Sequence, residues 1–250
     1  MELSIFLYVL VGFVAQVIDG ALGMAYGVSS NTFLLSIGVP PAAASASVHL
    51  AEVFTTGISG FSHWKLGNVD WKLVKRLLLP GVLGGVAGAY LLTSIDGNFI
   101  KPYISAYLLI MGVVILVKAV RYEAKPHNGV HTAKVSVLGL IGGFFDAIGG
   151  GGWGPIVTTT LVARGKDARL TIGSVNFSEF FVTFAESVTF VLTLSLLDYW
   201  QIILGLLIGG AIAAPMAAIL TKKLPVKTLM FIVGLLIVGL SIRTIVMAIN

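Results

Sequence analysis

An apolar stretch that is interrupted by glycines and carries one acidic residue occurs twice in this chain. The first copy reads GFVAQVIDGALGMAYG from Gly12, and the second reads GLIGGFFDAIGGGGWG from Gly139. The offset is 127 residues without a gap, and 12 of 46 aligned positions are identical, among them Asp19 and Asp146. Two glycine-broken hydrophobic segments at matching places in two halves predict a transporter whose site lies at the repeat interface.

The composition places the chain in a membrane. Hydrophobic residues make up 57% and charged residues 11% of it, whereas about a quarter of the residues of a soluble domain are charged. Long apolar segments in such a chain predict an all-α polytopic membrane protein with the lipid bilayer as its surroundings. The net charge of +5 comes from the loops between the segments, so no nucleic-acid partner is expected. The absence of cysteine excludes disulfides and thiolate metal sites.

Residues 4–36 and 135–163 are too long for one membrane crossing and too short for two. At about 1.5 Å per residue, 4–36 would form a helix of roughly 50 Å, against a hydrocarbon core of about 30 Å. Clustered glycines weaken the middle of each stretch, so each is predicted to form two re-entrant half-helices. Pro155 suits the first turn of a second arm, and Gly38 and Gly165 suit its C-terminal end.

The other apolar segments predict ordinary spans at residues 41–62, 77–95, 99–120, 168–194, 200–221 and 225–248. Each half then has four segments and three crossings, so the two halves are inverted relative to each other. The expected organisation is a first inverted repeat at 1–120, a cytoplasmic linker at 121–133 and a second inverted repeat at 134–250.

This topology gathers 14 of the 16 Lys and Arg residues on one side, which the positive-inside rule identifies as cytoplasmic. The basic loops 63–76, 118–134, 164–169 and 222–227 are therefore expected in the cytoplasm, and both termini outside. The N-terminus lacks the basic region of a cleaved signal peptide, so residues 4–18 are expected in the mature protein. Arg243 fits this topology least well and is expected to extend toward the outer interface.

Five acidic residues lie within apolar segments: Asp19, Glu52, Asp146, Glu179 and Glu186. An acidic side chain at the bilayer centre costs about 2.5–3.5 kcal/mol on insertion scales, so such residues normally face a protein interior or a wet cavity. Asp19 and Asp146 stand beside the glycine breaks. They fit two roles, which are compatible: accepting the free N–H groups of the second arm, or taking part in transport.

Polar residues at helical spacing form a matching stripe in each half. The stripes comprise His49, Glu52, Thr56 and Ser59 in the first half, and Asn176, Glu179, Thr183 and Glu186 in the second. A stripe that faces a central pathway is favoured over one that only makes interhelical hydrogen bonds. His49 is the only histidine within a span and could titrate near neutral pH, although a lone histidine is more often a hydrogen-bonding group. A ridge of glycines at Gly81, Gly84, Gly85 and Gly88 indicates close helix packing.

Hydroxyl and amide side chains follow each break. The N-termini of two half-helices present free N–H groups and positive dipole ends, which suit a small oxyanion without any lysine or arginine. Ionised acids would repel that anion, so its transport would be coupled to protonation of a carboxylate. Tyr26 and Trp153 stand at matched positions before Gly27 and Gly154. A role in gating the site and a role in packing are equally compatible with these positions.

The two breaks and the two four-segment halves resemble the sulfite exporter TauE/SafE family, also called the toluene sulfonate uptake permease family. The resemblance covers the whole chain, and its most specific element is GGGGWGP at Gly149–Pro155. The first copy departs from this pattern, with Leu22, Met24, Ala25 and Val28 at the positions of Gly149, Gly151, Gly152 and Pro155. Such proteins are implicated in moving sulfite, sulfoacetate, sulfonates and other sulfur-containing anions across bacterial inner membranes. The resemblance therefore implies an anion carrier of the inner membrane.

The predicted function is a secondary transporter of sulfite or a related small sulfur-containing anion across the cytoplasmic membrane. Export, proton coupling and alternating access are expected. A rival is a proton- or metal-cation carrier that uses the intramembrane acids and His49. A remote alternative is an intramembrane aspartyl hydrolase built on Asp19 and Asp146, which would need their carboxyls within hydrogen-bond reach. No enzymatic activity, cofactor or resident metal ion is expected, and an oligomer is compatible with the sequence.

The residues expected to bind the substrate or the coupling proton lie at the breaks, at the starts of the second arms and on the stripes. They are Gln16, Asp19, Gly23, Tyr26, Gly27, Ser29, Ser30, Asn31, Thr32, His49, Glu52, Thr56, Asp146, Gly150, Trp153, Gly154, Pro155, Thr158, Thr159, Asn176, Glu179, Thr183 and Glu186.

Overall fold

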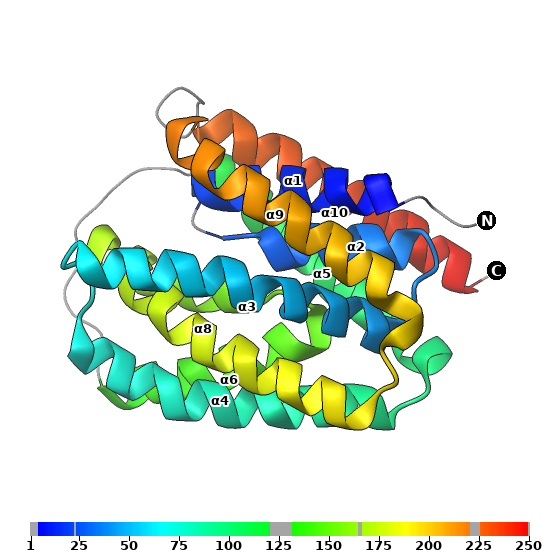
Figure 1. Ribbon diagram of the computed structural model, residues 1–250, viewed down its shortest axis with the longest axis horizontal. Coiled ribbons are helices and arrows are strands. Elements are labelled where there is room, and N and C mark those ends of the chain that lie inside the picture. Colours follow the sequence, from blue (N-terminus) through cyan, green and yellow to red (C-terminus); the bar gives the residue numbers. More distant parts are fainter. Residues whose placement is uncertain (1–4, 23, 121–131, 165–166, 221–225, 250) are drawn as a thin grey trace.

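The computed structural model describes residues 5–22, 24–120, 132–164, 167–220 and 226–249, and these ranges contain helices and no strand (Figure 1). The helices are α1 (Ile5–Leu22), α2 (Tyr26–Ser36), α3 (Pro41–Lys65), α4 (Trp71–Ser94), α5 (Gly97–Val120), α6 (Thr132–Gly149), η1 (Gly154–Thr158), α7 (Thr159–Ala163), α8 (Ala168–Thr193), η2 (Leu197–Tyr199), α9 (Trp200–Leu220) and α10 (Val226–Ile249). Five segments, within α4, α5, α8, α9 with η2, and α10, are long and apolar enough to span a membrane. The prediction of an all-α polytopic membrane protein is confirmed.

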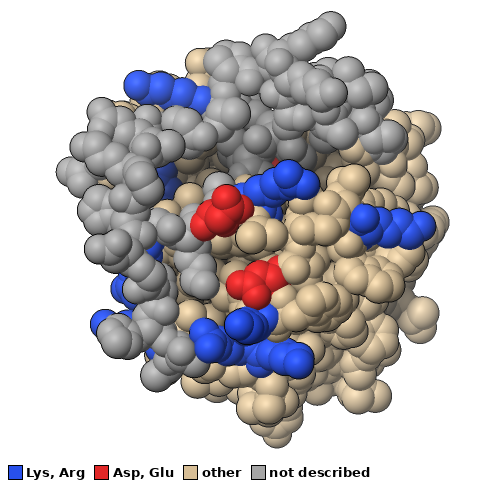
Figure 2. Space-filling view, turned by 90° about the vertical axis from the view of Figure 1, so that its left-hand side faces the viewer, with Lys and Arg blue, Asp and Glu red and all other residues tan. Residues whose placement is uncertain are grey.

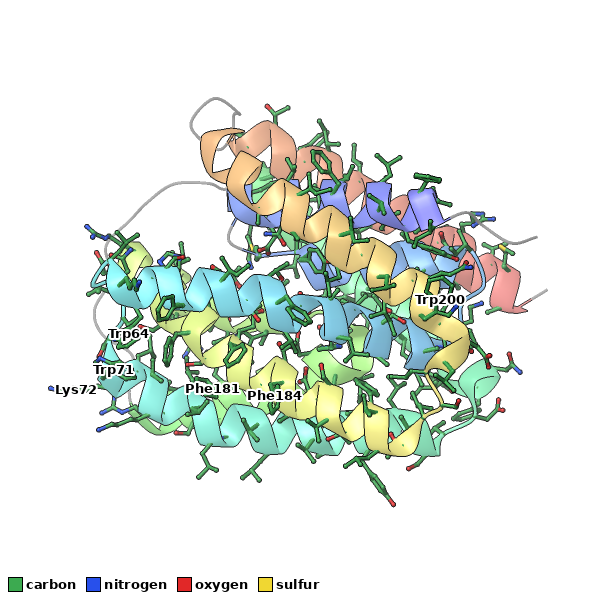
Figure 3. The ribbon with its side chains drawn as sticks, in the orientation of Figure 1. Trp64, Trp71, Lys72, Phe181, Phe184 and Trp200 are labelled. Atoms are coloured by element: carbon green, nitrogen blue, oxygen red, sulfur yellow. The ribbon has the colours of Figure 1, made fainter. Side chains whose placement is uncertain are left out.

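Helix α3 forms where a span was predicted, but it is not among the five apolar segments. Ser45, Ser47, His49 and Glu52 lower its hydropathy, and all four are buried. Helix α3 packs against α8 and α9 (Figure 1), while large hydrophobic residues on it, among them Phe54, Ile58 and Trp64, are exposed (Figure 3). Its polar residues therefore face protein, which is the setting that a polar intramembrane helix requires.

Both glycine-broken segments turn back inside the molecule. Helix α1 runs inward and α2 returns to the same end, while α6 runs inward from the opposite end and η1 with α7 returns there (Figure 1). The first turn passes through Ala25, with a φ of +90°, and the second through Gly150 and Gly151, with φ of +63° and +154°. Gly38 follows α2 with a φ of +98°, as predicted for a C-terminal glycine. Gly23 and Gly165 lie outside the described residues.

The second arm of the second half differs from the single half-helix that was predicted. It begins as a π-helix, η1, and continues as the short helix α7. Pro155 stands at the second position of this arm, where its missing N–H group removes no helical hydrogen bond, so the proline alone does not account for the π-helix. π-Helical turns of this kind are found mostly as single turns and frequently at functional sites.

Helices at matching positions in the two halves make matching contacts. Helix α1 packs on α9 as α6 packs on α4, and the pairs α3 with α8 and α5 with α10 also join one half to the other. Glycines permit the closest approaches: a Cβ at Gly84 would overlap the carbonyl of Leu140, and one at Gly209 would overlap that of Val9. The glycine ridge thus packs closely, as predicted. The inverted repeat and its boundaries stay a prediction.

Basic residues gather at one end of the molecule. Helices α3, α5 and α7 end there and α4, α6, α8 and α10 begin there, while the described chain starts and stops at the opposite end (Figure 1). Figure 2 looks onto the first end and shows Lys and Arg side chains spread across it. The linker 121–133 lies almost wholly outside the described residues, as do Lys222 and Lys223.

Arg243 does not behave as the sequence suggested. Its Nη1 atom donates to the carbonyl of Ser36, at the C-terminal end of α2. Because the end of a helix carries a partial negative charge, a cation is stabilised there. The guanidinium therefore caps a re-entrant arm, rather than only extending toward the outer interface.

Candidate functional site

The two breaks touch each other in the interior. A Cβ on Gly27 would overlap the carbonyl of Gly150, and a Cβ on Gly151 would overlap the backbone nitrogen of Val28. The Nδ2 atom of Asn31 donates to the carbonyl of Gly149 at 2.6 Å. The starts of both second arms are therefore in contact, as a site at the interface of two halves requires.

Each break is closed by its own aspartate. An Oδ1 atom of Asp19 accepts the N–H of Tyr26 at 3.4 Å, and Oδ1 of Asp146 accepts the N–H groups of Gly152 and Trp153 at 2.5 and 2.8 Å. These contacts match the first of the two roles considered for the aspartates, because each carboxylate satisfies N–H groups at the start of a second arm. The two carboxylates thus bond within their own halves, which is not the shared-proton contact of an aspartyl hydrolase.

Tyr26 and Trp153 anchor the arms in the core. Both are almost completely buried. The Tyr26 hydroxyl donates to the carbonyl of Leu206 at 3.1 Å, and Trp153 Nε1 donates to that of Val175 at 3.2 Å. Buried aromatic residues of this kind hold their polar atom on a fixed partner, so these contacts favour packing over gating.

Several side chains on the second arms keep free polar atoms. Ser29 Oγ, Ser30 Oγ, Asn31 Oδ1 and Thr158 Oγ1 are buried without a hydrogen-bond partner among the described residues. An unpaired buried polar atom costs about 1–3 kcal/mol, so each of these atoms needs an explanation. The hydroxyls of Thr32 and Thr159, by contrast, donate to carbonyls one turn earlier in their own arms.

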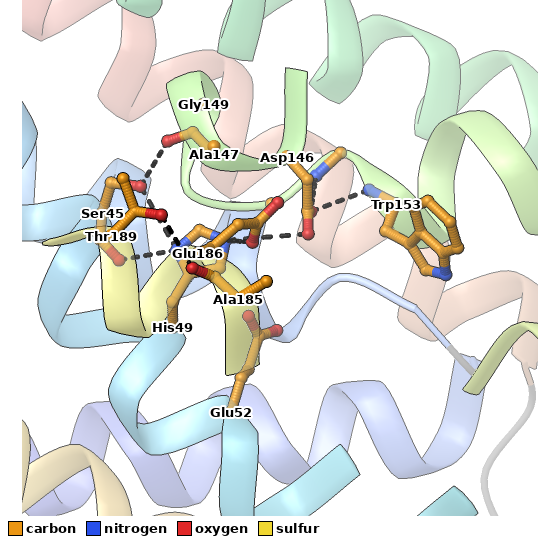
Figure 4. A network of polar contacts seen from close by, with 12 residues as sticks. Ser45, His49, Glu52, Asp146, Ala147, Gly149, Trp153, Ala185, Glu186 and Thr189 are labelled. Atoms are coloured by element: carbon orange, nitrogen blue, oxygen red, sulfur yellow. Dashed lines mark hydrogen bonds and ion pairs between the residues drawn. The ribbon is translucent and has the colours of Figure 1, made fainter. Parts of the chain in front are cut away.

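A buried cluster of ionisable groups lies where α3, α6 and α8 meet (Figure 4). His49 Nε2 is 2.8 Å from Glu186 Oε2 and 3.6 Å from Asp146 Oδ2. The exposed fractions of the three residues are 0%, 0% and 3%. On the other side of the imidazole, Nδ1 lies 2.7 Å from the backbone oxygen of Ser45, whose hydroxyl donates to the carbonyl of Ala147. The cluster joins His49 of the first half to two acids of the second.

The two polar stripes face each other only in part. Asn176 Nδ2 donates to Ser59 Oγ at 3.0 Å across α3 and α8, and Thr56 donates to the carbonyl of Glu52 within its own helix. Glu52 is buried, Glu179 is half-buried, and Thr183 Oγ1 is buried without a described partner. Gln16 is buried on α1, and its Oε1 atom is likewise unpaired. The stripes therefore meet at two places, where Asn176 contacts Ser59 and where His49 contacts Glu186.

Two residues contact the site in ways that the sequence analysis did not indicate. Gly85 on α4 makes room for Glu186, because a Cβ there would lie 2.8 Å from its Cγ atom. The glycine ridge thus also shapes the acidic cluster, and only the α4–α8 contact reveals this. Lys118, near the end of α5, donates from Nζ to the carbonyl of Pro155 at 3.3 Å. Its long side chain reaches the re-entrant arm from a helix end, which sequence spacing could not indicate.

Ala25 is strained at the first break, and replacing it with glycine is expected to stabilise the protein. An L-residue in a left-handed conformation costs about 1–2 kcal/mol, while glycine loses roughly 0.5–1 kcal/mol more conformational entropy on folding. Ala25→Gly should therefore gain about 0.5–1 kcal/mol, seen as a higher apparent melting temperature in detergent. Ala46→Gly, within helix α3, is the control and should lose about 1 kcal/mol. Equal losses for both variants would contradict the left-handed conformation.

Comparisons with known proteins agree with this architecture. The sequence model of the sulfite exporter TauE/SafE family matches residues 8–244. The chain is 42% identical to the probable membrane transporter protein YtnM of Bacillus subtilis (strain 168), covering 97% of this chain and 83% of that protein. It is 27% identical to a probable membrane transporter protein of Haemophilus influenzae, covering 98% and 97% of the two chains. No solved structure matches the chain.

Proposed function

Because the chain belongs to the sulfite exporter TauE/SafE family and is a multi-pass membrane transporter, we propose that it carries a small sulfur-containing oxyanion, such as sulfite, across the cytoplasmic membrane. The expected direction is export, by alternating access at the interface of the two halves. The basic end of the molecule would face the cytoplasm.

The unpaired polar atoms on the second arms carry this proposal. Ser29, Ser30, Asn31 and Thr158 lie on the two arms whose starts touch at Gly27 and Gly151. The Ser29, Ser30 and Thr158 hydroxyl groups can donate hydrogen bonds to an oxyanion, as can the unpaired Thr183 hydroxyl on α8, whereas Asn31 Oδ1 can only accept. An anion bound there would satisfy atoms that are costly to leave unpaired in a nonpolar interior.

The carboxylates at the two breaks are the reason to propose proton coupling. The Asp19 and Asp146 carboxylates hold the N–H groups that were expected to bind the anion, and Glu52 and Glu179 add further acidic groups. A sulfur oxyanion would be repelled while these groups are ionised. Protonation of at least one carboxyl group removes a negative charge and creates a donor, so the anion and a proton would bind together.

The test is sulfite flux into proteoliposomes that contain the purified full chain, with an imposed pH gradient and sulfate, sulfoacetate and thiosulfate as competitors. We expect saturable flux that responds to the gradient. The double variant Ser30→Ala, Thr158→Ala should raise the KM about tenfold or more, since two donors are lost at about 1 kcal/mol each. Ser62→Ala, at an exposed hydroxyl near the end of α3, is the control and should leave flux unchanged.

Two results would count against parts of the proposal. If Glu52→Gln and Glu179→Gln both leave flux and its pH dependence unchanged, these residues carry no coupling proton. If no sulfur anion moves and an added cation drives acidification instead, the chain is a cation carrier. The buried contacts between His49, Asp146 and Glu186 favour that second candidate.

A further inference from the structure

We propose that His49, Asp146 and Glu186 form a binding site for one divalent transition-metal ion of the zinc class. The ligand atoms are His49 Nε2, Asp146 Oδ2 and a carboxylate oxygen of Glu186. The sequence analysis expected no resident metal ion and named a metal-cation carrier that uses the intramembrane acids and His49 only as a rival. The three residues stand on three different helices. The site concerns binding alone and does not depend on the identity of the transported anion.

The distances suit a single cation. One ligand atom from each of the three residues lies within 4.8 Å of the others. Zinc bonds of about 2.0–2.1 Å in a tetrahedral arrangement place neighbouring ligand atoms about 3.3 Å apart. The observed separations from His49 Nε2 are 2.8 and 3.6 Å, on either side of that value. The two carboxylate oxygens lie within 4.8 Å of each other, so the Asp146 and Glu186 side chains would close around the ion as it binds.

The contacts around the imidazole prepare Nε2 for a metal. Nδ1 lies 2.7 Å from the backbone oxygen of Ser45, which requires the proton of a neutral ring to sit on Nδ1. Nε2 then presents a lone pair toward the acids. A histidine that binds a metal through one nitrogen usually donates its other N–H group to a carbonyl or carboxylate, as His49 does here. The acid is held as well, because Gly152 and Trp153 fix Asp146 through Oδ1 and leave Oδ2 free.

Contacts among the three side chains account for only part of the cluster. His49 Nε2, Asp146 Oδ2 and both carboxylate oxygens of Glu186 have no aligned hydrogen-bond partner among the described residues, although Nε2 and Oε2 are only 2.8 Å apart. No ion pair with Lys or Arg is present at these acids in the described part of the chain. One bridging proton would satisfy one pair of atoms, whereas a divalent cation satisfies all three ligands and balances two carboxylates.

The ligand set indicates the class of metal. An imidazole together with carboxylates suits zinc and its neighbours, whereas magnesium and calcium are bound through oxygen alone. Three protein ligands leave a fourth position open to a further group. Because His49 belongs to the first half and both acids to the second, the bound ion would join the two halves.

The first experiment measures metal binding by the purified full chain in detergent, stripped with a chelator and free of sulfur anions. Zinc is titrated by calorimetry, and cobalt by its visible absorption spectrum. We expect one site per chain, with proton release on binding. His49→Gln and Glu186→Gln should each weaken binding about tenfold or more, as lost ligands weaken a site at least as much as lost outer contacts. His63→Gln, on the same helix but half-exposed and near Asn68, should bind as the unmodified protein does.

Each other outcome overturns the proposal. If neither zinc nor cobalt binds, the cluster binds protons only and is not a metal site. Binding that survives both substitutions, or that is lost in His63→Gln, would place the ion elsewhere. If magnesium binds as tightly as zinc, the His49 imidazole is not a ligand, because magnesium is bound through oxygen alone.

Where the substituted proteins fail to fold, the cobalt spectrum of the unmodified protein tests the proposal. A spectrum of a four- or five-coordinate site with nitrogen and oxygen ligands supports the proposal. A six-coordinate spectrum like that of cobalt in water contradicts it. Because no anion is present, these results are independent of the sulfite flux.

Discussion

Gly151→Ala is expected to destabilise the protein by about 3 kcal/mol or more and to abolish transport. A Cβ on Gly151 would overlap Val28 and Gly27 backbone atoms, which cannot move without separating the two breaks. Overpacking costs typically 1–3 kcal/mol, and a φ of +154° adds about 1–3 kcal/mol of backbone strain. The measurements are the apparent melting temperature in detergent and the yield of monodisperse protein.

Gly38→Ala separates the two contributions to that loss. Gly38 also has a positive φ, of +98°, but no atom lies within 4 Å of a Cβ built on it. Its substitution should therefore cost only the backbone strain of about 1–2 kcal/mol and should preserve transport. Equal losses for Gly38→Ala and Gly151→Ala would show that the contact between the two breaks contributes nothing, contrary to the structure.

Asp146→Ala and Asp146→Asn are expected to have different effects on stability and the same effect on transport. Alanine leaves the N–H groups of Gly152 and Trp153 unpaired, at about 1–3 kcal/mol each, so we expect a loss of about 3 kcal/mol. Asparagine keeps an oxygen for both N–H groups and should cost under about 1.5 kcal/mol. Both variants remove the carboxylate that faces His49, so sulfite flux should fall about tenfold or more.

The control for this pair is Asp198→Asn, at an acid on η2 that lies outside the site. It should change neither stability nor flux. Full flux in Asp146→Asn, with the loss of stability confined to Asp146→Ala, would limit this residue to its structural contacts. Thermal unfolding and flux in the same protein preparations distinguish these outcomes.

Much of the fold could be predicted because the bilayer restricts the choices. Hydropathy placed the apolar helices, and clustered glycines placed both breaks. The π-helix at Gly154–Thr158 could not be predicted, since Pro155 is compatible with either an α-helical or a π-helical first turn. The polarity of α3 was seen, but its position between α8 and α9 depends on long-range packing.

The sequence named the residues of the candidate site, which stays a prediction, and it did not indicate the contacts between them. Asp19 and Asp146 were identified from the repeat, and their bonds to the second arms follow from local geometry. The pairing of His49 with Glu186 was not foreseen, because it depends on how α3 crosses α8. Gly85 and Lys118 act through contacts between distant segments, and no spacing in the sequence indicates these contacts.

The unequal second arms have a consequence for the resting state of a carrier that exchanges the roles of its halves. Identical halves would give the inward-open and outward-open forms the same free energy. Here one arm is eleven residues of regular α-helix, and the other is a five-residue π-helix followed by a five-residue α-helix. A free-energy difference of about 1.4 kcal/mol between the two forms makes one of them ten times more populated than the other. In such a carrier, the protein without substrate would mainly populate the form that is open to one compartment. The difference between the two arms would thereby determine the side from which the substrate binds.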